Sequence, residues 1–472
     1  MRVVVIGAGV GGLATAVRLA AAGHAVCVLE AGAAPGGKCG RVEAGGYTWD
    51  SGPSLLTMPW VFEALFAETG APLSEVVELL PVEPVTRYRF ADGSGFDLSS
   101  DLGASRTALD AWRPGAGDEW ARFMATCERM WTASEPVLTG PAPWPPSRAA
   151  RSSPGALLAV KPWWTLRQLA RAHTTDVRLQ MVIERFATYA GADPRRAPAA
   201  LALAGYVEHA WGAWHPRGGM YALVEALVGR LAALSGELRL GTPARRVALA
   251  PGPRRTGGLL GGTRRVTGVE TDAGLVPADA VVAAVDAETV RRRLLGRRVP
   301  PREPSVSGLA LMLGLRGRTP DLVHHAITFP AAYDAEFDDV FAGRPARDPT
   351  VYVSASCATD PGETPENWFV LVNAPSTGEA DWEAEAERLI DRLGVRDRIA
   401  ARALRSPADL GRETGARSIY GVAPHGRLGT LKRPATTVRG VDGLWITGGT
   451  VHPGGGLPLV ALGAATTARA VG

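Results

Sequence analysis

The pattern of apolar positions is clearest at the N-terminal end of the chain. Residues 3–6 are a short β-branched run, as in a fully buried parallel strand. A glycine-rich stretch follows, and residues 13–22 are small and apolar, which favours a helix that ends at Gly23. Residues 25–29 form a second buried run that ends at Glu30. This succession predicts a complete strand–helix–strand unit.

The rest of the chain alternates between strand and helix patterns. Further strands are indicated at 86–90 and 95–98 around an Asp92-Gly93 turn, and at 237–240, 245–249, 265–271, 278–285, 308–315, 350–356, 368–373 and 443–447. Helical patterns occur within 60–135 and at 162–171, 222–233, 379–393 and 459–470. We expect 278–285 to return to the first sheet and the strands between 308 and 373 to form a second sheet.

The first glycine stretch has the spacing of a dinucleotide-binding turn. Gly7 permits the tight turn off the strand, Gly9 lets the backbone approach a pyrophosphate, and Gly12 lets helix and strand pack closely. The helix N-terminus faces the phosphate charge. Glu30, at the end of the second strand, can accept hydrogen bonds from ribose hydroxyls. The motif is specific because it lies within a predicted strand–helix–strand unit.

Two more glycine elements extend this interpretation. Gly36-Gly37-Lys38 comes just after the second strand, where the glycines allow close backbone approach and Lys38 can meet phosphate charge. Residues 448–458 lie between a strand and a helix, and such a loop suits the ribityl chain and ring end of a flavin. The Gly/Arg-rich segment 251–264 lacks a flanking buried strand and helix, so we interpret it as a hairpin loop.

Composition excludes several other classes of protein. The 472 residues are 46% hydrophobic and 21% charged, with no run near the roughly 20 apolar residues of a membrane span and no secretory signal, which favours a cytoplasmic protein. The net charge of +4 comes with no basic helix or nucleic-acid motif, so no nucleic-acid partner is expected. No disulfide or metal site is expected from the four scattered cysteines, Cys27, Cys39, Cys127 and Cys357.

Tryptophan is concentrated in one part of the chain. Six of the 13 tryptophans are Trp112, Trp120, Trp131, Trp144, Trp163 and Trp164. With Lys161, Arg167 and Arg171 nearby, this segment has the composition of a face that enters the lipid interface. The alternative is tryptophan in core or domain packing.

The chain resembles the phytoene desaturase family of bacterial carotenoid-modifying flavoproteins nearly from end to end. The motifs that carry the resemblance are residues 7–38, Asp50-Ser51-Gly52-Pro53-Ser54, Trp214-His215-Pro216-Arg217-Gly218-Gly219-Met220, His324-His325, Glu336-Phe337-Asp338-Asp339, Asp348-Pro349 and residues 449–458. Amine oxidases share the two ends of this set but not its middle. The commoner family form of the C-terminal loop has alanine between the glycines and valine before the proline. This chain instead reads Gly454-Gly455-Gly456-Leu457-Pro458, so the exact substrate stays open.

The resemblance implies an α/β fold in which a Rossmann-like FAD-binding domain of the amine oxidase/phytoene desaturase type carries an inserted α+β substrate domain. We expect the FAD-binding domain at 1–85, 214–300 and 416–472, and the substrate domain at 86–213 and 301–415. A helical, membrane-facing segment is expected at 136–191, so the resemblance favours the membrane interpretation of the tryptophans. The protein would then be cytoplasmic and peripherally associated with the inner face of the cell membrane.

FAD is implied as the sole redox cofactor. The residues expected to bind it are Gly7, Gly9, Gly11, Gly12, Glu30, Ala31, Gly36, Gly37, Lys38, Gly52, Pro53, Ser54, Val247, Gly448, Gly449, Gly456, Leu457 and Pro458. The turn at 50–54 is expected to bring backbone close to the isoalloxazine ring.

The implied reaction is desaturation of a long isoprenoid, such as phytoene, neurosporene or a hydroxylated acyclic carotene. A hydride passes to flavin N5 and a proton to a base or solvent, in a hydrophobic tunnel whose substrate comes from the membrane. Oxygen or a quinone is the expected electron acceptor. No catalytic residue is assigned. His324-His325 is the obvious candidate, but adjacent residues on a strand point to opposite faces, and the resemblance implies that the pair is structural or lines the substrate region.

Three alternatives remain open on the sequence. A carotenoid oxygenase or isomerase of the same family would use the same fold. An amine oxidase-like enzyme would act on a soluble substrate. A prenyl carrier related to GDP-dissociation inhibitors is disfavoured because both glycine loops and Glu30 are intact.

Overall fold

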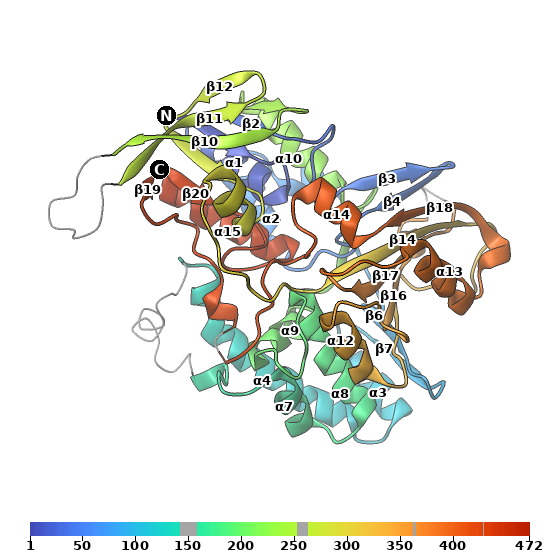
Figure 1. The fold of residues 1–472 in the computed structure, drawn as a ribbon. Coiled ribbons are helices and arrows are strands. Elements are labelled where there is room, and N and C mark those ends of the chain that lie inside the picture. Colours follow the sequence, from blue (N-terminus) through green and yellow to red (C-terminus); the bar gives the residue numbers. More distant parts are fainter. Residues whose placement is uncertain (142–157, 253–262, 362–364, 428) are drawn as a thin grey trace.

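The chain folds around two large sheets (Figure 1). The computed structural model describes residues 1–141, 158–252, 263–361, 365–427 and 429–472. The first sheet is parallel, with the strand order β20-β13-β1-β2-β9. Its strands are β1 (Arg2–Ile6), β2 (Ala25–Leu29), β9 (Glu237–Arg239), β13 (Ala280–Ala283) and β20 (Leu444–Ile446). The predicted strand–helix–strand unit and the return of 278–285 to this sheet are confirmed.

Both faces of the first sheet are buried. Val3 and Val5 pack with helices, whereas Val4 and Ile6 pack with an antiparallel sheet on the opposite face. The helices are α1 (Val10–Ala21), α2 (Trp60–Glu68), α10 (Ala222–Ala233) and α15 (Leu457–Val471), and the antiparallel sheet holds β10 (Ala244–Pro251), β11 (Arg264–Thr271), β12 (Gly274–Pro277) and β19 (Val441–Asp442). Burial on both faces explains why these strands are continuous apolar runs. Most of the predicted 251–264 loop lies outside the described residues.

The second sheet has seven strands in the order β18-β14-β17-β16-β15-β6-β7. The strands predicted between 308 and 373 belong to it, whereas β15 and β18 were not predicted. They are β6 (Thr86–Arg89), β7 (Gly95–Leu98), β14 (Ser307–Leu315), β15 (His325–Thr328), β16 (Val351–Ser354), β17 (Asn367–Ala374) and β18 (Ile399–Arg405). The hairpin of β3 (Arg41–Ala44) and β4 (Tyr47–Asp50) packs on this sheet through Tyr47 and Trp49. A separate ribbon pairs β5 (Leu79–Pro81) with β8 (Trp214–Pro216).

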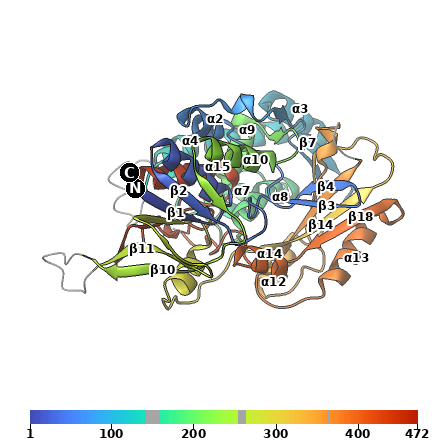
Figure 2. The ribbon, with the colours of Figure 1, turned by 90° about the horizontal axis from the view of Figure 1, so that it is seen from above.

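A helical layer covers one face of the second sheet around an aromatic core (Figures 1 and 2). Its helices are α3 (Leu102–Trp112), α4 (Ala116–Leu138), α7 (Leu166–His173), α8 (Val177–Glu184), α9 (Leu203–Trp211) and α12 (Tyr333–Phe341). Elsewhere lie α11 (Ala287–Thr289), α13 (Trp382–Leu393) and α14 (Pro407–Thr414). Two helices begin later than predicted because Thr165 and Asp381 accept backbone hydrogen bonds as N-caps.

The tryptophans of residues 112–164 are divided between core and surface. Trp120 and Trp131 are buried, and Trp112 and Trp164 pack against the aromatic core. Trp163 is 50% exposed, and Trp144 lies outside the described residues. The interpretation as tryptophan in core or domain packing therefore fits four of the six tryptophans. Within the described ranges, no helix is both long and apolar enough to cross a bilayer.

One ion-pair cluster ties three of these helices together. Arg167 on α7 donates to Glu184 on α8 at 2.6 Å and to Asp334 on α12 at 2.7 Å. Glu184 is only 3% exposed, and burial raises the pKa of its carboxyl group. The arginine therefore compensates a carboxylate that has little water around it.

We expect Arg167→Ala to lower the free energy of unfolding by about 3 kcal/mol, because it leaves a buried carboxylate without its cation. Arg245→Ala is the matched control, since Arg245 and Asp272 form a pair whose side chains are 48% and 62% exposed. That variant should lose much less stability, because exposed ion pairs contribute little. Chemical denaturation measures both, and equal losses would contradict the assignment.

Candidate functional site

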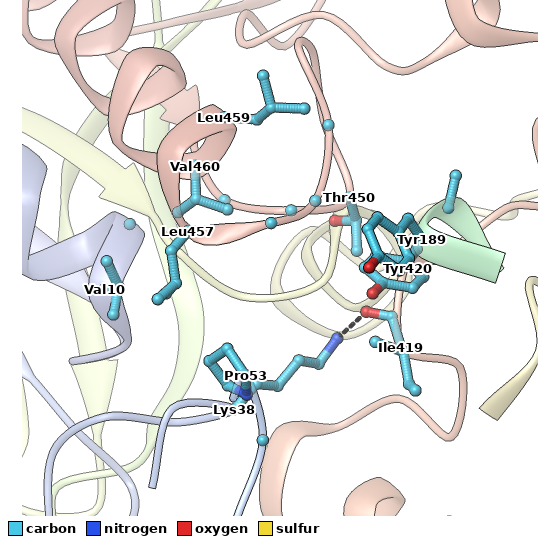
Figure 3. Close-up of a pocket in the computed structure, with 18 of the residues that line it drawn as sticks. Val10, Lys38, Pro53, Tyr189, Ile419, Tyr420, Thr450, Leu457, Leu459 and Val460 are labelled. Atoms are coloured by element: carbon cyan, nitrogen blue, oxygen red, sulfur yellow. Dashed lines mark hydrogen bonds between the residues drawn. The ribbon is translucent and has the colours of Figure 1, made fainter. Parts of the chain in front are cut away.

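A single cavity of about 880 Å³ joins the glycine loops to the interior of the second sheet (Figure 3). The predicted cofactor residues that line it are Gly7, Gly9, Gly11, Glu30, Ala31, Gly36, Gly37, Lys38, Gly52, Pro53, Ser54, Gly448, Gly449, Gly456, Leu457 and Pro458. These segments are far apart in the sequence, so the fold has brought them together. Two predicted residues, Gly12 and Val247, are not among the lining residues.

The first glycine turn has two positions with opposite steric demands. A Cβ at Gly12 would lie 2.0 Å from the Gly7 carbonyl oxygen, so this glycine permits the close packing of helix and strand. A Cβ at Gly9 would have no protein atom nearer than 3.8 Å. Gly9 has an ordinary extended backbone and precedes α1 directly. The protein therefore leaves room at Gly9, beside the helix N-terminus, where a phosphate group can bind.

Glu30 lies at the end of β2, beside this turn. Its two carboxylate oxygens accept the backbone N–H groups of Ala8 and Gly32, each at 2.7 Å. A carboxylate oxygen has a second lone pair, so both can still accept a hydrogen bond from a hydroxyl. The two backbone contacts fix the orientation of the side chain at the cavity wall.

The Gly36-Gly37-Lys38 element and the Gly52 turn are packed against each other. A Cβ at Gly52 would lie 1.8 Å from the Lys38 carbonyl oxygen. The Lys38 amine donates to the carbonyl oxygens of Ile419 and Ser418 (Figure 3). Burial lowers the pKa of Lys38 to about 8. The structure thus gives this amine two backbone acceptors, whereas the sequence suggested a phosphate.

The C-terminal loop meets the first turn directly. A Cβ at Gly11 would lie 2.9 Å from Val460 and 3.1 Å from the Cα of Gly448. Gly448 has a φ of +110°, and Pro458 lies in the first turn of α15. The N-termini of α1 and α15 therefore border the same cavity, as the repeated strand–loop–helix order predicted.

Val247 is not part of this cavity. It lies on β10, is 1% exposed, and packs with Leu29 and Val281 in the core between two sheets. Ala244, at the start of the same strand, lines the cavity instead.

Gly12, the other predicted residue outside the lining, acts through packing, as its predicted role requires.

The cavity wall also holds a polar cluster that the sequence analysis missed. Arg185 donates to the hydroxyls of Tyr88 and Tyr189, each at 2.7 Å, and to Glu208 at 3.3 Å. Tyr189 donates to Glu208 at 2.5 Å. Burial raises the pKa of the Glu208 carboxyl group. The residues belong to no recognised motif, and only the fold brings them together.

Most of the other residues of the inner wall are apolar, although Ser307, Tyr333, Thr350, Tyr352 and Asn373 also line it. The apolar residues include Leu201, Leu203, Val207, Val306, Ala310, Ile327, Phe369 and Leu371. Such a wall excludes water and fits a hydrocarbon chain. The cavity therefore combines a nucleotide-type end, built from glycine turns, with a hydrophobic interior.

The interpretation of His324 and His325 as residues on opposite faces of a strand is wrong. His324 precedes β15, so the alternation of a strand does not apply to it. The two rings lie together, with centroids 4.4 Å apart. Both residues are buried, and neither lines the cavity. In the described part of the chain, no three His, Cys, Asp or Glu side chains are arranged to hold a metal ion.

Comparison with known proteins matches this geometry. A family model described as flavin containing amine oxidoreductase matches residues 10–310. Hydroxyneurosporene desaturase from Rhodobacter capsulatus is 34% identical over 496 residues, which cover 99% of this chain and 97% of that protein. The chain belongs to the carotenoid desaturase family of flavin-containing amine oxidoreductases. As a member of this family, it is an FAD-dependent oxidoreductase.

Other relatives of this desaturase-family chain differ in their chemistry. A 4,4'-diapolycopene oxygenase from Methylomonas sp is 32% identical over 98% of this chain and 96% of its own length. The solved structure of cyclohexylamine oxidase from Brevibacterium oxydans has a TM-score of 0.62 at 17% identity, covering 100% of this chain and 98% of that one. The second comparison shows a shared fold.

Two alanine substitutions separate cofactor binding from folding. We expect Gly9→Ala to weaken FAD binding about tenfold or more, or about 1.4 kcal/mol, because its methyl group occupies the space left for the ligand. The thermal midpoint of the apoprotein should not change, since the methyl meets no protein atom. Gly12→Ala should instead destabilise the apoprotein. FAD titration and thermal unfolding give both readouts, and loss of apoprotein stability in Gly9→Ala would refute this division.

Proposed function

We propose that this protein catalyses the FAD-dependent desaturation of a long isoprenoid, such as phytoene, neurosporene or a hydroxylated acyclic carotene. The observation that carries the proposal is the continuity of the cavity, in which the glycine loops and a hydrophobic interior share one space. The full-length similarity to hydroxyneurosporene desaturase supports the substrate class.

The cofactor would be held by the two glycine loops and the segments between them. Gly7, Gly9 and Gly11 would bind the pyrophosphate with the N-terminus of α1, and Glu30 with Ala31 would bind the ribose. Gly36, Gly37 and Lys38 complete this end. The turn Gly52-Pro53-Ser54 would lie against the ring, and Gly448, Gly449, Gly456, Leu457 and Pro458 would border the ribityl chain and ring.

When bound, the flavin supplies hydride acceptance at N5, the part of the chemistry that side chains cannot perform. The protein's own contribution is to hold a flexible hydrocarbon chain in register and to keep water away. Phe369, Leu371 and Ile327 lie on the inner wall and suit both tasks. Oxygen or a quinone would reoxidise the cofactor.

We divide the chain between two functional parts. Residues 1–85, 214–300 and 416–472 would form the FAD-binding domain, and residues 86–213 and 301–415 the substrate domain. The hairpin β3–β4 lies within the first range but packs on the second sheet, so it would link the parts.

The substrate would enter from a membrane along residues 136–191. Val160 and Pro162 line the cavity, whereas Leu158 and Trp163 nearby are 64% and 50% exposed. Lys161 lies 4.1 Å from the Trp164 ring. Exposed apolar groups beside a cation suit an anionic lipid surface. We therefore place the protein in the cytoplasm, peripherally at the inner face of the cell membrane.

Incubation with FAD and phytoene, neurosporene or hydroxylated carotenes in liposomes tests the function. We expect each step to remove two hydrogens from the carotene and to shift its absorption to longer wavelength. A gain of oxygen mass would favour the reaction named for the Methylomonas relative. Unchanged carotenes together with oxidation of a soluble amine would refute the proposal.

Leu158→Ser combined with Trp163→Ser tests the membrane face. We expect this variant to lose most of its binding to vesicles of anionic lipid in a sedimentation assay, because it removes the exposed apolar groups. Leu275→Ser is the control, since Leu275 is 53% exposed on β12, in the antiparallel sheet. Equal binding by all three proteins would count against a membrane role for this segment.

A further inference from the structure

A hydrogen-bonded chain leads from the cavity wall into the protein. Ser54 and Tyr352 both line the cavity, and their hydroxyl oxygens are 2.5 Å apart. The Tyr352 hydroxyl also lies 2.7 Å from Nδ1 of His325, which is fully buried behind it. A polar group that faces the cavity is thus connected to an imidazole that does not.

Behind Tyr352, three imidazole rings pack together without hydrogen bonds between them. The centroids of His325 and His324 are 4.4 Å apart, and those of His324 and His215 are 4.8 Å apart. Nε2 of His325, Nε2 of His324 and Nδ1 of His215 are buried without a hydrogen-bond partner. Buried nitrogens of this kind are costly unless they serve a purpose. The grouping shows no metal-binding arrangement.

Asp360 is the charged residue that acts on His215. Its negative charge favours the protonated form of His215, and its carboxylate accepts from Gly218 at 2.9 Å and from Arg217 at 3.2 Å. Arg217 is 48% exposed at its side chain. Asp360 thus belongs to an ion pair that reaches water, and its charge acts on the third imidazole.

The tautomers can be arranged so that the unpartnered nitrogens complement each other. If Tyr352 donates to Nδ1 of His325, then His325 carries its proton on Nε2. If His324 donates from Nδ1 to Thr359 at 2.7 Å, its Nε2 is an acceptor. A donor and an acceptor then lie in adjacent rings.

The surroundings keep the imidazoles neutral at rest. Burial lowers the pKa of His325 to about 3 and that of His215 to about 4, and the neighbouring rings and the Arg185 cation act in the same direction on His325. Asp360 opposes this at His215 alone. A neutral imidazole can accept a proton at one nitrogen and release one from the other.

We propose that Tyr352 is the proton acceptor of the desaturation and that it relays its own proton to Nδ1 of His325; this rests on the proposed function. One allylic C–H bond gives its electron pair, as hydride, to the flavin. The adjacent C–H bond gives its proton to the Tyr352 oxygen while the Tyr352 proton moves to Nδ1 of His325. The electron pair of that second bond becomes the new π bond.

A weak base is sufficient for this step. Loss of hydride leaves positive charge next to the second C–H bond, which makes that hydrogen strongly acidic. Glu208, an anionic group at the inner wall, already accepts from Tyr189 and Arg185. Tyr352 differs because its hydroxyl oxygen lies 2.7 Å from Nδ1 of the neutral His325, which can take its proton.

Two variants and a control test the relay by flavin reduction in a single anaerobic turnover at saturating carotene. Tyr352→Phe and His325→Asn should slow reduction about 100-fold or more, with carotene affinity and FAD content unchanged. His325→Asn places an amide oxygen near the Nδ1 position, so it keeps an acceptor but cannot pass a proton on. Tyr333→Phe should match the wild type, because Tyr333 lines the same cavity but its hydroxyl is buried without a hydrogen-bond partner.

Nuclear magnetic resonance of the apoprotein gives a readout independent of turnover. With its eight histidines labelled in the ring nitrogens, His325 should appear as the neutral Nε2–H tautomer, and Tyr352→Phe should shift its Nδ1 signal. An Nδ1–H tautomer would overturn the relay, since His325 could not then accept.

The two proposals fail in distinguishable ways. If the wild type desaturates a carotene and Tyr352→Phe reduces its flavin within about threefold of the wild-type rate, the relay is wrong and the function stands. If the wild type oxidises no carotene, the proposed function falls and the relay with it.

Discussion

The constraint on which the rest of the structure depends is the contact between two glycine loops. Gly11 and Gly448 approach so closely that a methyl group on Gly11 would be 3.1 Å from the Gly448 Cα. This contact sets α1 and α15 side by side and brings β20 into the sheet begun by β1. Because the helices pack through small residues, both N-termini border one cavity. A larger side chain at this junction would separate the two halves of the cofactor site.

From this junction the cavity changes character toward the second sheet. Backbone and glycine dominate near the loops, and hydrocarbon side chains dominate beyond them. Arg185 and Glu208, two charged groups of the inner wall, are paired with each other. Paired polar groups cost less in an apolar setting than isolated ones, so the wall can remain dry while it holds charge.

The elements of the first sheet could be predicted because their strands are buried on both faces. Residues 3–6, 25–29 and 278–285 carry that signal in their own sequence, and the glycine spacing marked the cofactor turn. The partners of Lys38 and the polar cluster at Arg185 could not be predicted, since each contact joins residues that only the fold brings together. His324 was misplaced because periodicity describes a strand and this residue lies before one. Composition likewise could not tell the buried Trp120 from the exposed Trp163.

The order of strands in the first sheet also bears on how the protein is made. β1 and β20 come from residues 2–6 and 444–446, yet only β13 lies between them in space. Chains emerge from the ribosome N-terminus first, at about 5–20 residues per second. The first sheet, which contains the strand–helix–strand unit, therefore keeps one strand edge unpaired until residues 444–446 have been translated. During that interval the sheet presents an unpaired strand edge, and the C-terminal glycine loop, which follows β20, has not yet been made.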